Sequence, residues 1–235
     1  MISAPVNVIG RALLTLGIVI GIALVIEMIA LVWLYLSVAR YRNYWNERSL
    51  VSGSVTYLAL GDSAAQGIGA TSPTRGYVGL LANRFHAKSP ESSLAVVNLS
   101  RTGSTMHDYL VDQAPKIKGL KADLVTIEIG ANDIKGFAPD AFRADFKRVL
   151  ATLPDGAYVS NMPLFNSRPG SRQHAKDASS IIEAELKIYP KLHFVDLQKQ
   201  TTENQSIFGF APDFFHPNDL SYRNWADAFW LEINR

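Results

Sequence analysis

Short apolar runs alternate with segments of helical periodicity through most of this chain, and that alternation restricts the possible folds more than any other feature. Each of five runs rich in aliphatic and β-branched residues precedes a segment whose apolar residues recur every three or four positions. A repeated strand–helix order predicts a parallel sheet with helices on both faces. The expected strands are Val55–Leu60, Leu94–Leu99, Leu124–Ile129, Ala157–Asn161 and His193–Leu197, and the expected helices are Gly76–Ala87, Thr105–Lys118, Pro139–Leu153, Arg172–Tyr189 and Asn218–Ile233.

Residues 1–39 contain an apolar stretch long enough to cross a membrane. Residues 12–38 carry one charged side chain, Glu27, and would extend roughly 40 Å as a helix, whereas a hydrocarbon core is about 30 Å thick. Cleavable signal peptides have apolar cores of only about 7–15 residues, so we expect a retained, single-pass anchor. The aromatic residues at its C-terminal end are expected at the membrane–water interface; they are Trp33, Tyr35, Tyr41, Tyr44 and Trp45.

The same segment bears on self-association and on orientation. Gly17 and Gly21 form a GxxxG pattern that allows two helices to approach closely, although glycine is also common in membrane helices that do not associate. Glu27 within the span indicates either a partner helix or a protonated side chain. One arginine precedes the span and three follow it before residue 50, which weakly favours a C-terminal domain on the cytoplasmic side and leaves the orientation open.

The remaining chain divides into a polar, aromatic connector at residues 40–53 and a domain at residues 54–235. The first fifty residues hold four of the 23 basic and two of the 21 acidic side chains, which leaves 19 of each in the rest of the chain. A neutral domain without a basic block is a poor partner for nucleic acid. The chain has no cysteine, which excludes disulfides, thiolate metal sites and a cysteine nucleophile.

Polar residues follow four of the expected strands. Ser63 comes after the first strand, Gly103 after the second and Asn132 after the third, and the last strand leads through a loop to Asp213 and His216. In an open parallel sheet, ligands bind beyond the carboxyl ends of the strands. The convergence of these residues on one edge therefore predicts a functional site.

The residue types at this edge fit acyl transfer. A serine on a strand–helix turn exposes its hydroxyl, and Asp213, three residues before His216, can orient the imidazole as a base for Ser63. Taken singly, Ser63 could be a helix cap and His216 a surface histidine. The Asn132 side chain and the backbone N–H groups of Gly103 and Ser63 would supply three donors to an oxyanion, although asparagine and glycine are also ordinary loop residues.

In sum, these residues resemble the SGNH or GDSL hydrolases over residues 55–235. The GDSxxxG block matches Gly61 to Gly67, the glycine block matches Gly103, the GxND block matches Gly130 to Asp133, and the DxxH block matches Asp213 and His216. The resemblance implies a three-layer α/β/α sandwich around a five-stranded parallel sheet. It also implies that Ser63 is the nucleophile, His216 the base and then the acid, and Asp213 its orienter, with an oxyanion hole of Ser63, Gly103 and Asn132. Ser221 stands where such proteins often carry glycine.

Together with the anchor, the resemblance predicts a serine esterase that acts on a lipid or lysophospholipid ester near the membrane through an acyl-enzyme on Ser63. No metal or other cofactor is expected; the expected partners are a small ester substrate and the bilayer. One alternative is an O-acetyl esterase or acyltransferase acting on envelope carbohydrate, and another is a catalytically inactive, membrane-anchored binding domain. An acyl site, or simply core packing, is expected for Met162–Phe165, Phe208, Phe210, Phe214 and Phe215.

Two other kinds of site remain as alternatives. Asp62, Asp133, Asp213 and His216 could hold a divalent ion for phosphoester hydrolysis, although the serine would then be idle. A nucleotide site is disfavoured, because the stretch from Gly61 to Gly69 has neither the GxGxxG pattern nor the lysine of a Walker loop.

Overall fold

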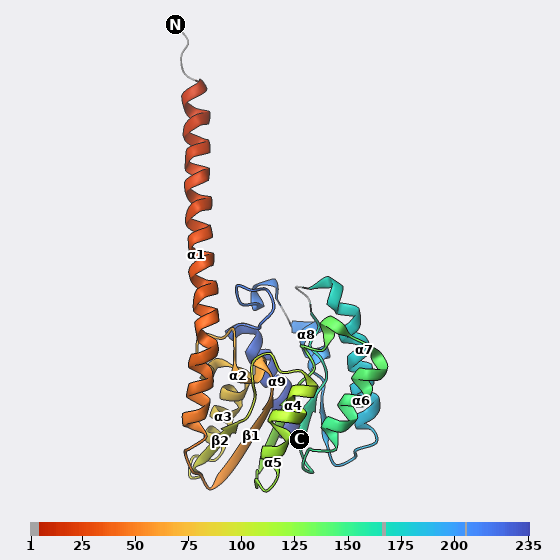
Figure 1. Cartoon of the computed structure of the whole chain (residues 1–235). Coiled ribbons are helices and arrows are strands. Elements are labelled where there is room, and N and C mark those ends of the chain that lie inside the picture. The colour runs from red at the N-terminus through yellow and green to blue at the C-terminus, as the bar shows by residue number, and fades with distance from the viewer. Residues whose placement is uncertain (1–4, 166–167, 205) are drawn as a thin grey trace.

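A five-stranded parallel sheet forms the centre of the domain, as the alternating sequence predicts. The computed structural model describes residues 5–165, 168–204 and 206–235. The strands lie in the order β2-β1-β3-β4-β5, and every pairing is parallel (Figure 1). Their bounds are β1 Val55–Gly61, β2 Leu94–Asn98, β3 Leu124–Glu128, β4 Tyr158–Ser160 and β5 His193–Val195.

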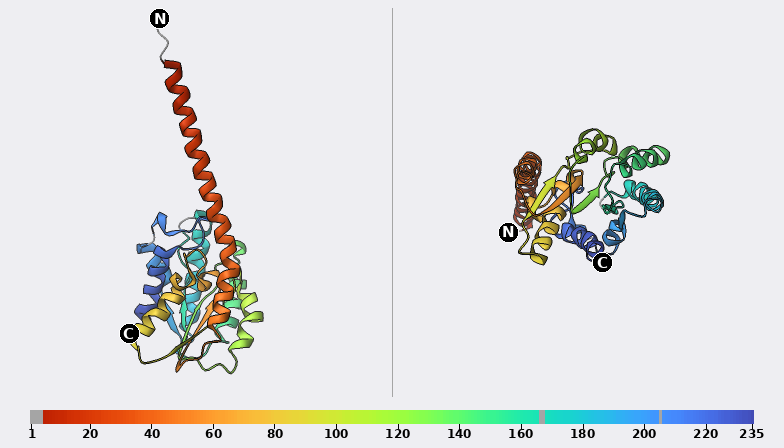
Figure 2. Two further views of the ribbon diagram at one scale, coloured as in Figure 1. Left: turned by 90° about the vertical axis from the view of Figure 1, so that its left-hand side faces the viewer. Right: turned by 90° about the horizontal axis from the view of Figure 1, so that it is seen from below.

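Helices cover both faces of the sheet and complete the three layers. The longer ones are α1 Pro5–Arg48, α3 Tyr77–Lys88, α4 Met106–Asp112, α6 Pro139–Leu150, α7 Pro169–Leu186, α8 Leu197–Asn204 and α9 Asp219–Ile233. Side chains alternate along β1. Leu58 and Leu60 join the core under α4, α6 and α7, whereas Tyr57 and Ala59 join the core under α3 and α9. Figure 2 shows the sheet between these two groups of helices. The predicted three-layer fold is confirmed.

Most expected helices are present within a few residues of their predicted bounds, but one is divided. The segment Thr105–Lys118 forms α4 and a separate short helix, α5 Ala114–Ile117. Pro115 lies in the first turn of α5. Proline has no N–H to donate and is tolerated only at the start of a helix, so the chain must begin a new helix there. The helix α2 Ser63–Gln66 is a single turn, too short to show any periodicity in the sequence.

The N-terminal helix does not end where the apolar stretch ends. We expected a connector at residues 40–53, but α1 continues to Arg48 without a break. Its last turns lie along the side of the domain, and its apolar part projects beyond it (Figures 1 and 2). The helix is long and apolar enough to cross a membrane from Gly10 onward. Gly17 and Gly21 lie on this projecting part, and a Cβ atom built on either would meet nothing within 4 Å apart from the helix's own backbone.

Two of the aromatic residues assigned to a bilayer interface are instead part of the protein core. Tyr41 is 4% exposed and Trp45 is 2% exposed. The Tyr41 hydroxyl donates a hydrogen bond of 2.7 Å to the backbone oxygen of Ala70, and the Trp45 indole donates one of 2.9 Å to that of Gln66. The expectation of an interfacial position was wrong for these two, because the helix carrying them packs on the domain. Tyr35, 79% exposed, still projects outward.

Candidate active site

Ser63 lies at the junction between strand β1 and helix α2. β1 ends at Gly61, and Asp62 caps α2 by accepting a hydrogen bond of 2.9 Å from the backbone N–H of Ala64. This cap is a normal way to satisfy a free N–H at the start of a helix. Ser63 is therefore the first residue of α2, and it lies at the carboxyl edge of the sheet as predicted.

The structure brings Ser63, His216 and Asp213 into one hydrogen-bonded row. Nε2 of His216 lies 2.9 Å from the hydroxyl oxygen of Ser63, and Nδ1 of His216 lies 2.5 Å from Oδ2 of Asp213. The other carboxylate oxygen of Asp213 accepts the backbone N–H groups of Phe215 and His216 at 3.0 and 3.1 Å. These contacts fix the imidazole with one nitrogen toward a carboxylate and the other toward the serine.

The loop that carries His216 can approach Ser63 because of one glycine. Gly69 has a φ of +97°, and a Cβ atom on it would lie 2.3 Å from the backbone oxygen of Pro217 and 2.8 Å from Cβ of His216. Both distances are far below van der Waals contact, so any other residue would push the histidine loop away. Gly69 thus allows the loop that carries Asp213 and His216 to lie within hydrogen-bonding distance of Ser63.

Asn132 and Gly103 lie at the same edge, beside Ser63. The side-chain amide of Asn132 donates to Oδ2 of Asp62 at 3.1 Å and to the backbone oxygen of Ser104 at 3.0 Å. It therefore joins the residue before Ser63 to the residue after Gly103. Gly103 has a φ of +81°, a conformation that favours glycine, and a Cβ built on it would contact nothing within 4 Å. The backbone at Gly103 is thus open to a ligand.

Hydrogen bonding keeps Asp213 ionised. Burial opposes ionisation, but the hydrogen bond from His216, its charge, and two backbone N–H groups outweigh it, so the pKa of Asp213 lies below its ordinary value. An ionised carboxylate at this position stabilises a positive charge on the imidazole, which a proton transfer from Ser63 would create.

Two further carboxyl groups, those of Asp62 and Glu128, are buried close to Ser63. Burial and the nearby charge of Asp62 raise the pKa of Glu128 well above its ordinary value, and burial raises the pKa of Asp62 to about 6. Glu128 is fully buried at the end of β3, and neither of its oxygens forms a hydrogen bond of ordinary geometry within the described residues. We infer that Glu128 holds its proton at neutral pH. Glu128 was not among the site residues predicted from the sequence, although a glutamate inside an apolar strand was a signal.

The protonated state of Glu128 leads to a prediction about stability. Above the ordinary glutamate pKa of 4.5, the unfolded chain releases a proton that the folded chain retains, so rising pH favours unfolding. Glu128→Gln cannot release this proton. We expect its melting temperature to fall less than that of the natural protein between pH 5 and pH 8, with a difference at pH 8 of several degrees, since about 2–4 °C corresponds to 1 kcal/mol in a domain of this size.

The control for that measurement is Glu183→Gln, which changes an exposed glutamate on α7. Thermal unfolding followed by circular dichroism should give this control the same pH dependence as the natural protein. If Glu128→Gln also followed the natural curve, Glu128 would have to be ionised in the folded state.

An apolar pocket opens beside the serine. Its cavity volume is about 30 Å³, and its walls include Leu164, Phe165, Phe210 and Phe215, together with Trp225 and Glu128. The pocket also borders Ser63 and His216. Of the eight positions expected to line an acyl site, three do not line this pocket: Met162 is buried in the core, and the side chains of Phe208 and Phe214 are 77% and 63% exposed.

The alternative of a metal site finds no matching arrangement. Among the residues that the structure describes, no three histidine, aspartate or glutamate side chains are grouped closely enough to hold a metal ion. Asp133 instead accepts a hydrogen bond of 3.1 Å from the backbone N–H of Met106, at the start of α4. Asp62, as noted, caps α2 and accepts from Asn132.

Solved structures share this fold at low sequence identity. LAE5, an alpha/beta hydrolase enzyme from the metagenome of Lake Arreo, Spain, is 21% identical with a TM-score of 0.65, and the match covers 79% of this chain and 98% of that one. Axe2, an acetylxylan esterase from Geobacillus stearothermophilus, is 22% identical with a TM-score of 0.60, covering 79% and 96% of the two chains. No curated protein matches this chain with significance.

The sequence profile of one family matches most of the domain. The profile of the GDSL-like Lipase/Acylhydrolase family covers residues 59–223, which includes Ser63, Gly103, Asn132, Asp213 and His216. The predicted resemblance is therefore confirmed at the level of the family, whose members are ester-hydrolysing enzymes. The chain belongs to the GDSL-like lipase and acylhydrolase family.

Proposed function

We propose that this protein is a membrane-anchored serine esterase that hydrolyses a lipid or lysophospholipid ester through an acyl-enzyme on Ser63. The observation that carries the proposal is the hydrogen-bonded row of Ser63, His216 and Asp213 beside an apolar pocket. Structures of Axe2 include catalytic mutants in which a serine, an aspartate or a histidine is replaced by alanine. The same three residue types form the row in this chain.

The geometry supports a two-step reaction. As the Ser63 oxygen attacks the ester carbonyl, its proton passes to Nε2 of His216, 2.9 Å away, and the carbonyl oxygen takes the negative charge. Collapse of this intermediate breaks the bond to the alcohol, which leaves with the proton from His216. Water then attacks the acyl-enzyme by the same route, and the acid departs. Asp213 stays ionised and stabilises the imidazolium in both steps.

The negative charge on the carbonyl oxygen has to be stabilised by hydrogen-bond donors. We propose the side-chain amide of Asn132 as one of them. Both hydrogens of its amide now donate, one to Asp62 and one to the backbone oxygen of Ser104, so one of these bonds must be exchanged for a bond to the oxyanion. We expect Asn132→Ala to lower kcat by about 10²- to 10³-fold with little change in KM, because the donor acts on charge that exists only in the transition state. Steady-state hydrolysis of p-nitrophenyl butyrate measures both constants. A rise in KM at unchanged kcat would place Asn132 in substrate binding instead.

The pocket and the helix together favour a lipid ester as the substrate. Leucine and phenylalanine side chains suit an alkyl chain and offer a sugar few hydrogen-bonding partners. The projecting part of α1 is long and apolar enough to hold the domain at a bilayer as a single-pass anchor. The second candidate, removal or transfer of acetyl groups on carbohydrate, is supported by the shared fold with an acetylxylan esterase.

Two measurements test the proposal. A fluorophosphonate should label Ser63 in the natural protein and leave Ser63→Ala unlabelled, as peptide mass spectrometry would reveal. Hydrolysis of p-nitrophenyl esters from acetate to decanoate should show kcat/KM rising with acyl length, because each added methylene gains about 0.8 kcal/mol on burial. A maximum at acetate would favour the carbohydrate candidate. Absence of labelling and of turnover would favour an inactive binding domain.

A further inference from the structure

The projecting helix and the loop that carries His216 contribute to the same small apolar cluster. Leu34 of α1 is buried in a small apolar cluster with Ile68 and Ala211. Ala211 belongs to the loop of residues 207–216, which also carries Asp213 and His216. Because α1 and this loop share a buried cluster, the position of the helix and the position of the loop depend on each other.

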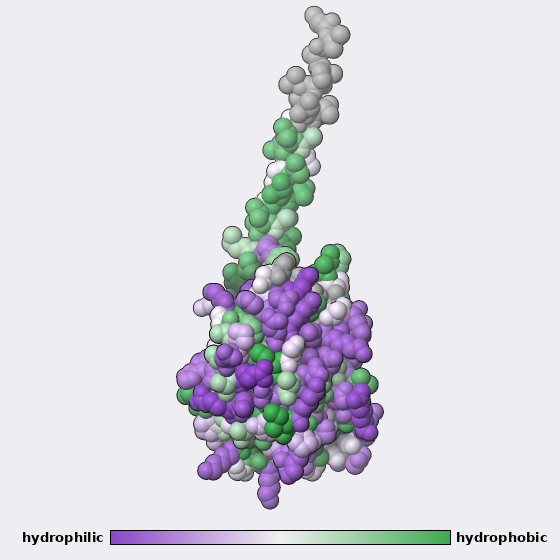
Figure 3. All heavy atoms as spheres, turned by 90° about the vertical axis from the view of Figure 1, so that its right-hand side faces the viewer, coloured by the Kyte–Doolittle hydropathy of each residue, from purple (hydrophilic) through white to green (hydrophobic). Residues whose placement is uncertain are grey.

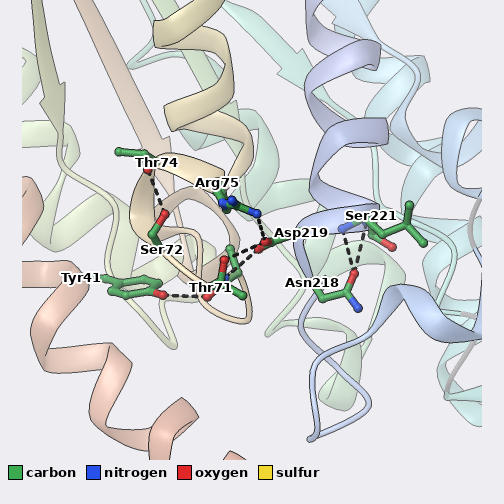
Figure 4. Close-up of polar contacts among 10 residues, drawn as sticks. Tyr41, Thr71, Ser72, Thr74, Arg75, Asn218, Asp219 and Ser221 are labelled. Carbon is green, nitrogen blue, oxygen red and sulfur yellow. Dashed lines mark hydrogen bonds and ion pairs between the residues drawn. The ribbon is translucent and has the colours of Figure 1, made fainter.

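Polar contacts extend this connection to the start of α9. Asp219, three residues after His216, accepts hydrogen bonds of 2.7 Å from both the backbone N–H and the hydroxyl of Thr71, and forms an ion pair of 2.9 Å with Arg75. The neighbouring residue Ala70 accepts from Tyr41 of α1. Figure 4 shows these contacts in sequence, from Tyr41 through Thr71 to Asp219. Helix α1 is therefore fixed in direction relative to the domain, with no flexible linker between them.

The apolar length of α1 ends at the level of the same loop. From Leu13 to Val32 its large aliphatic side chains are 41% to 66% exposed, whereas Leu34 is buried against the domain. Those twenty or so residues extend about 30 Å, the thickness of a hydrocarbon core. A bilayer that covers them would have its surface near Trp33 and Tyr35, on either side of Leu34, which shares a buried cluster with Ala211. The carboxyl ends of the strands, where Ser63 lies, point in the direction in which α1 projects from the domain (Figure 1).

The loop presents apolar side chains at that level. Ile207 is 79% exposed and Phe208 is 77% exposed, and Phe214 is 63% exposed. The backbone carrying them is held in place, because the Asn218 amide donates to the backbone oxygen of Phe208 at 2.7 Å and to that of Phe210 at 3.1 Å. Hydrophilic residues dominate the face of the domain seen in Figure 3, whereas hydrophobic residues cover the projecting helix.

We propose that Ile207, Phe208 and Phe214 enter the interface of the bilayer that α1 spans, so that the apolar pocket opens toward lipid. This inference rests on the membrane anchor of the proposed function. A bilayer fits better than a second copy of the chain or a soluble partner, because the exposed residues lie at the level where the exposed apolar part of α1 ends, on a loop that shares a buried cluster with that helix. An ester with its acyl chain in the leaflet would then reach Ser63 without crossing water.

Labelling at single cysteines tests this directly, because the natural chain has none. The full chain, as Phe208→Cys, Ile188→Cys or Val25→Cys, would carry an environment-sensitive NBD fluorophore in phosphatidylcholine vesicles containing brominated lipid. Ile188 is a matched control: it is 67% exposed and lies between α7 and β5, at the opposite edge of the sheet. We expect blue-shifted, bromine-quenched fluorescence at positions 25 and 208 and an unquenched aqueous spectrum at 188.

The outcomes separate the inference from the proposed function. Quenching at 25 with an aqueous spectrum at 208 would overturn the inference and leave the anchor intact. An aqueous spectrum at 25 would contradict the anchor and, with it, the inference, whereas soluble-ester hydrolysis would still report on the esterase. Quenching at position 188 as well as at position 208 would also overturn the inference, because the bilayer would then contact the domain on more than the side of this loop.

A kinetic measurement provides an independent test. Ile207→Ser with Phe208→Ser should lower the ratio of vesicle-embedded long-chain ester hydrolysis to soluble p-nitrophenyl acetate hydrolysis by about tenfold, because two apolar side chains no longer favour the interface. Ile188→Ser with Leu231→Ser, which removes equally exposed apolar side chains elsewhere, should keep the natural ratio. An unchanged ratio in the first pair would contradict the inference.

Discussion

Replacing Ser63 with alanine should lower kcat/KM for ester hydrolysis by roughly 10⁴- to 10⁶-fold, because the residues of a nucleophile–base row act as a unit. The hydroxyl that accepts the acyl group is gone, and His216 has no proton to take. For the same reason, His216→Ala added to Ser63→Ala should cost little more. Hydrolysis of p-nitrophenyl butyrate by the two single variants and the double variant measures this non-additivity.

Stability is the control for that experiment. Ser63 is 4% exposed, and alanine fits the same space, so thermal unfolding of Ser63→Ala should match that of the natural protein within a few degrees. A variant that unfolded normally and kept more than a tenth of the natural activity would rule out Ser63 as the nucleophile.

Replacing Asp213 with asparagine should lower kcat by about 10⁴-fold while leaving the loop in place. The Oδ1 atom of the amide can still accept the backbone N–H groups of Phe215 and His216, as the carboxylate does now. An NH₂ group cannot accept the hydrogen on Nδ1 of His216, so the imidazole would carry its proton on the nitrogen that faces Ser63. That nitrogen could then no longer act as a base.

Asp196→Asn is the matched control for this variant. Asp196 follows β5 and also accepts hydrogen bonds, from the Asn161 amide at 2.9 Å and the backbone of Lys199 at 3.0 Å, but it lies outside the row. Its kcat should stay within about twofold of the natural value, as expected for a substitution away from the chemistry. Equal losses in both variants would mean that the effect of Asp213→Asn came from folding.

The fold and the row of three residues could be predicted because they depend on local rules. Alternation of apolar runs with helical segments determined the parallel sheet, and parallel strands place their carboxyl ends along one edge. Asp213 and His216 are three residues apart, so a tight loop suffices to pair them. The strand bounds were correct to within two residues, since the apolar runs end where the site loops begin.

The features that could not be predicted depend on contacts between distant segments. Tyr41 and Trp45 have the composition of an interfacial belt, and only the partners Ala70 and Gln66 reveal that they are buried in protein. Gly69 is one glycine among several, and its role appears only when Pro217 lies against it. The break at Pro115 is different, because its signal was present in the sequence.

The unbroken helix from the apolar stretch to the side of the domain has a consequence for how the enzyme meets its substrate. In the proposed membrane-anchored state, this unbroken helix would keep Ser63 at a constant distance from the bilayer, whereas a flexible linker would let that distance vary. Under that proposal, enzyme and ester would meet in two dimensions, and turnover would depend on the surface density of ester in the leaflet rather than on its concentration in bulk solution.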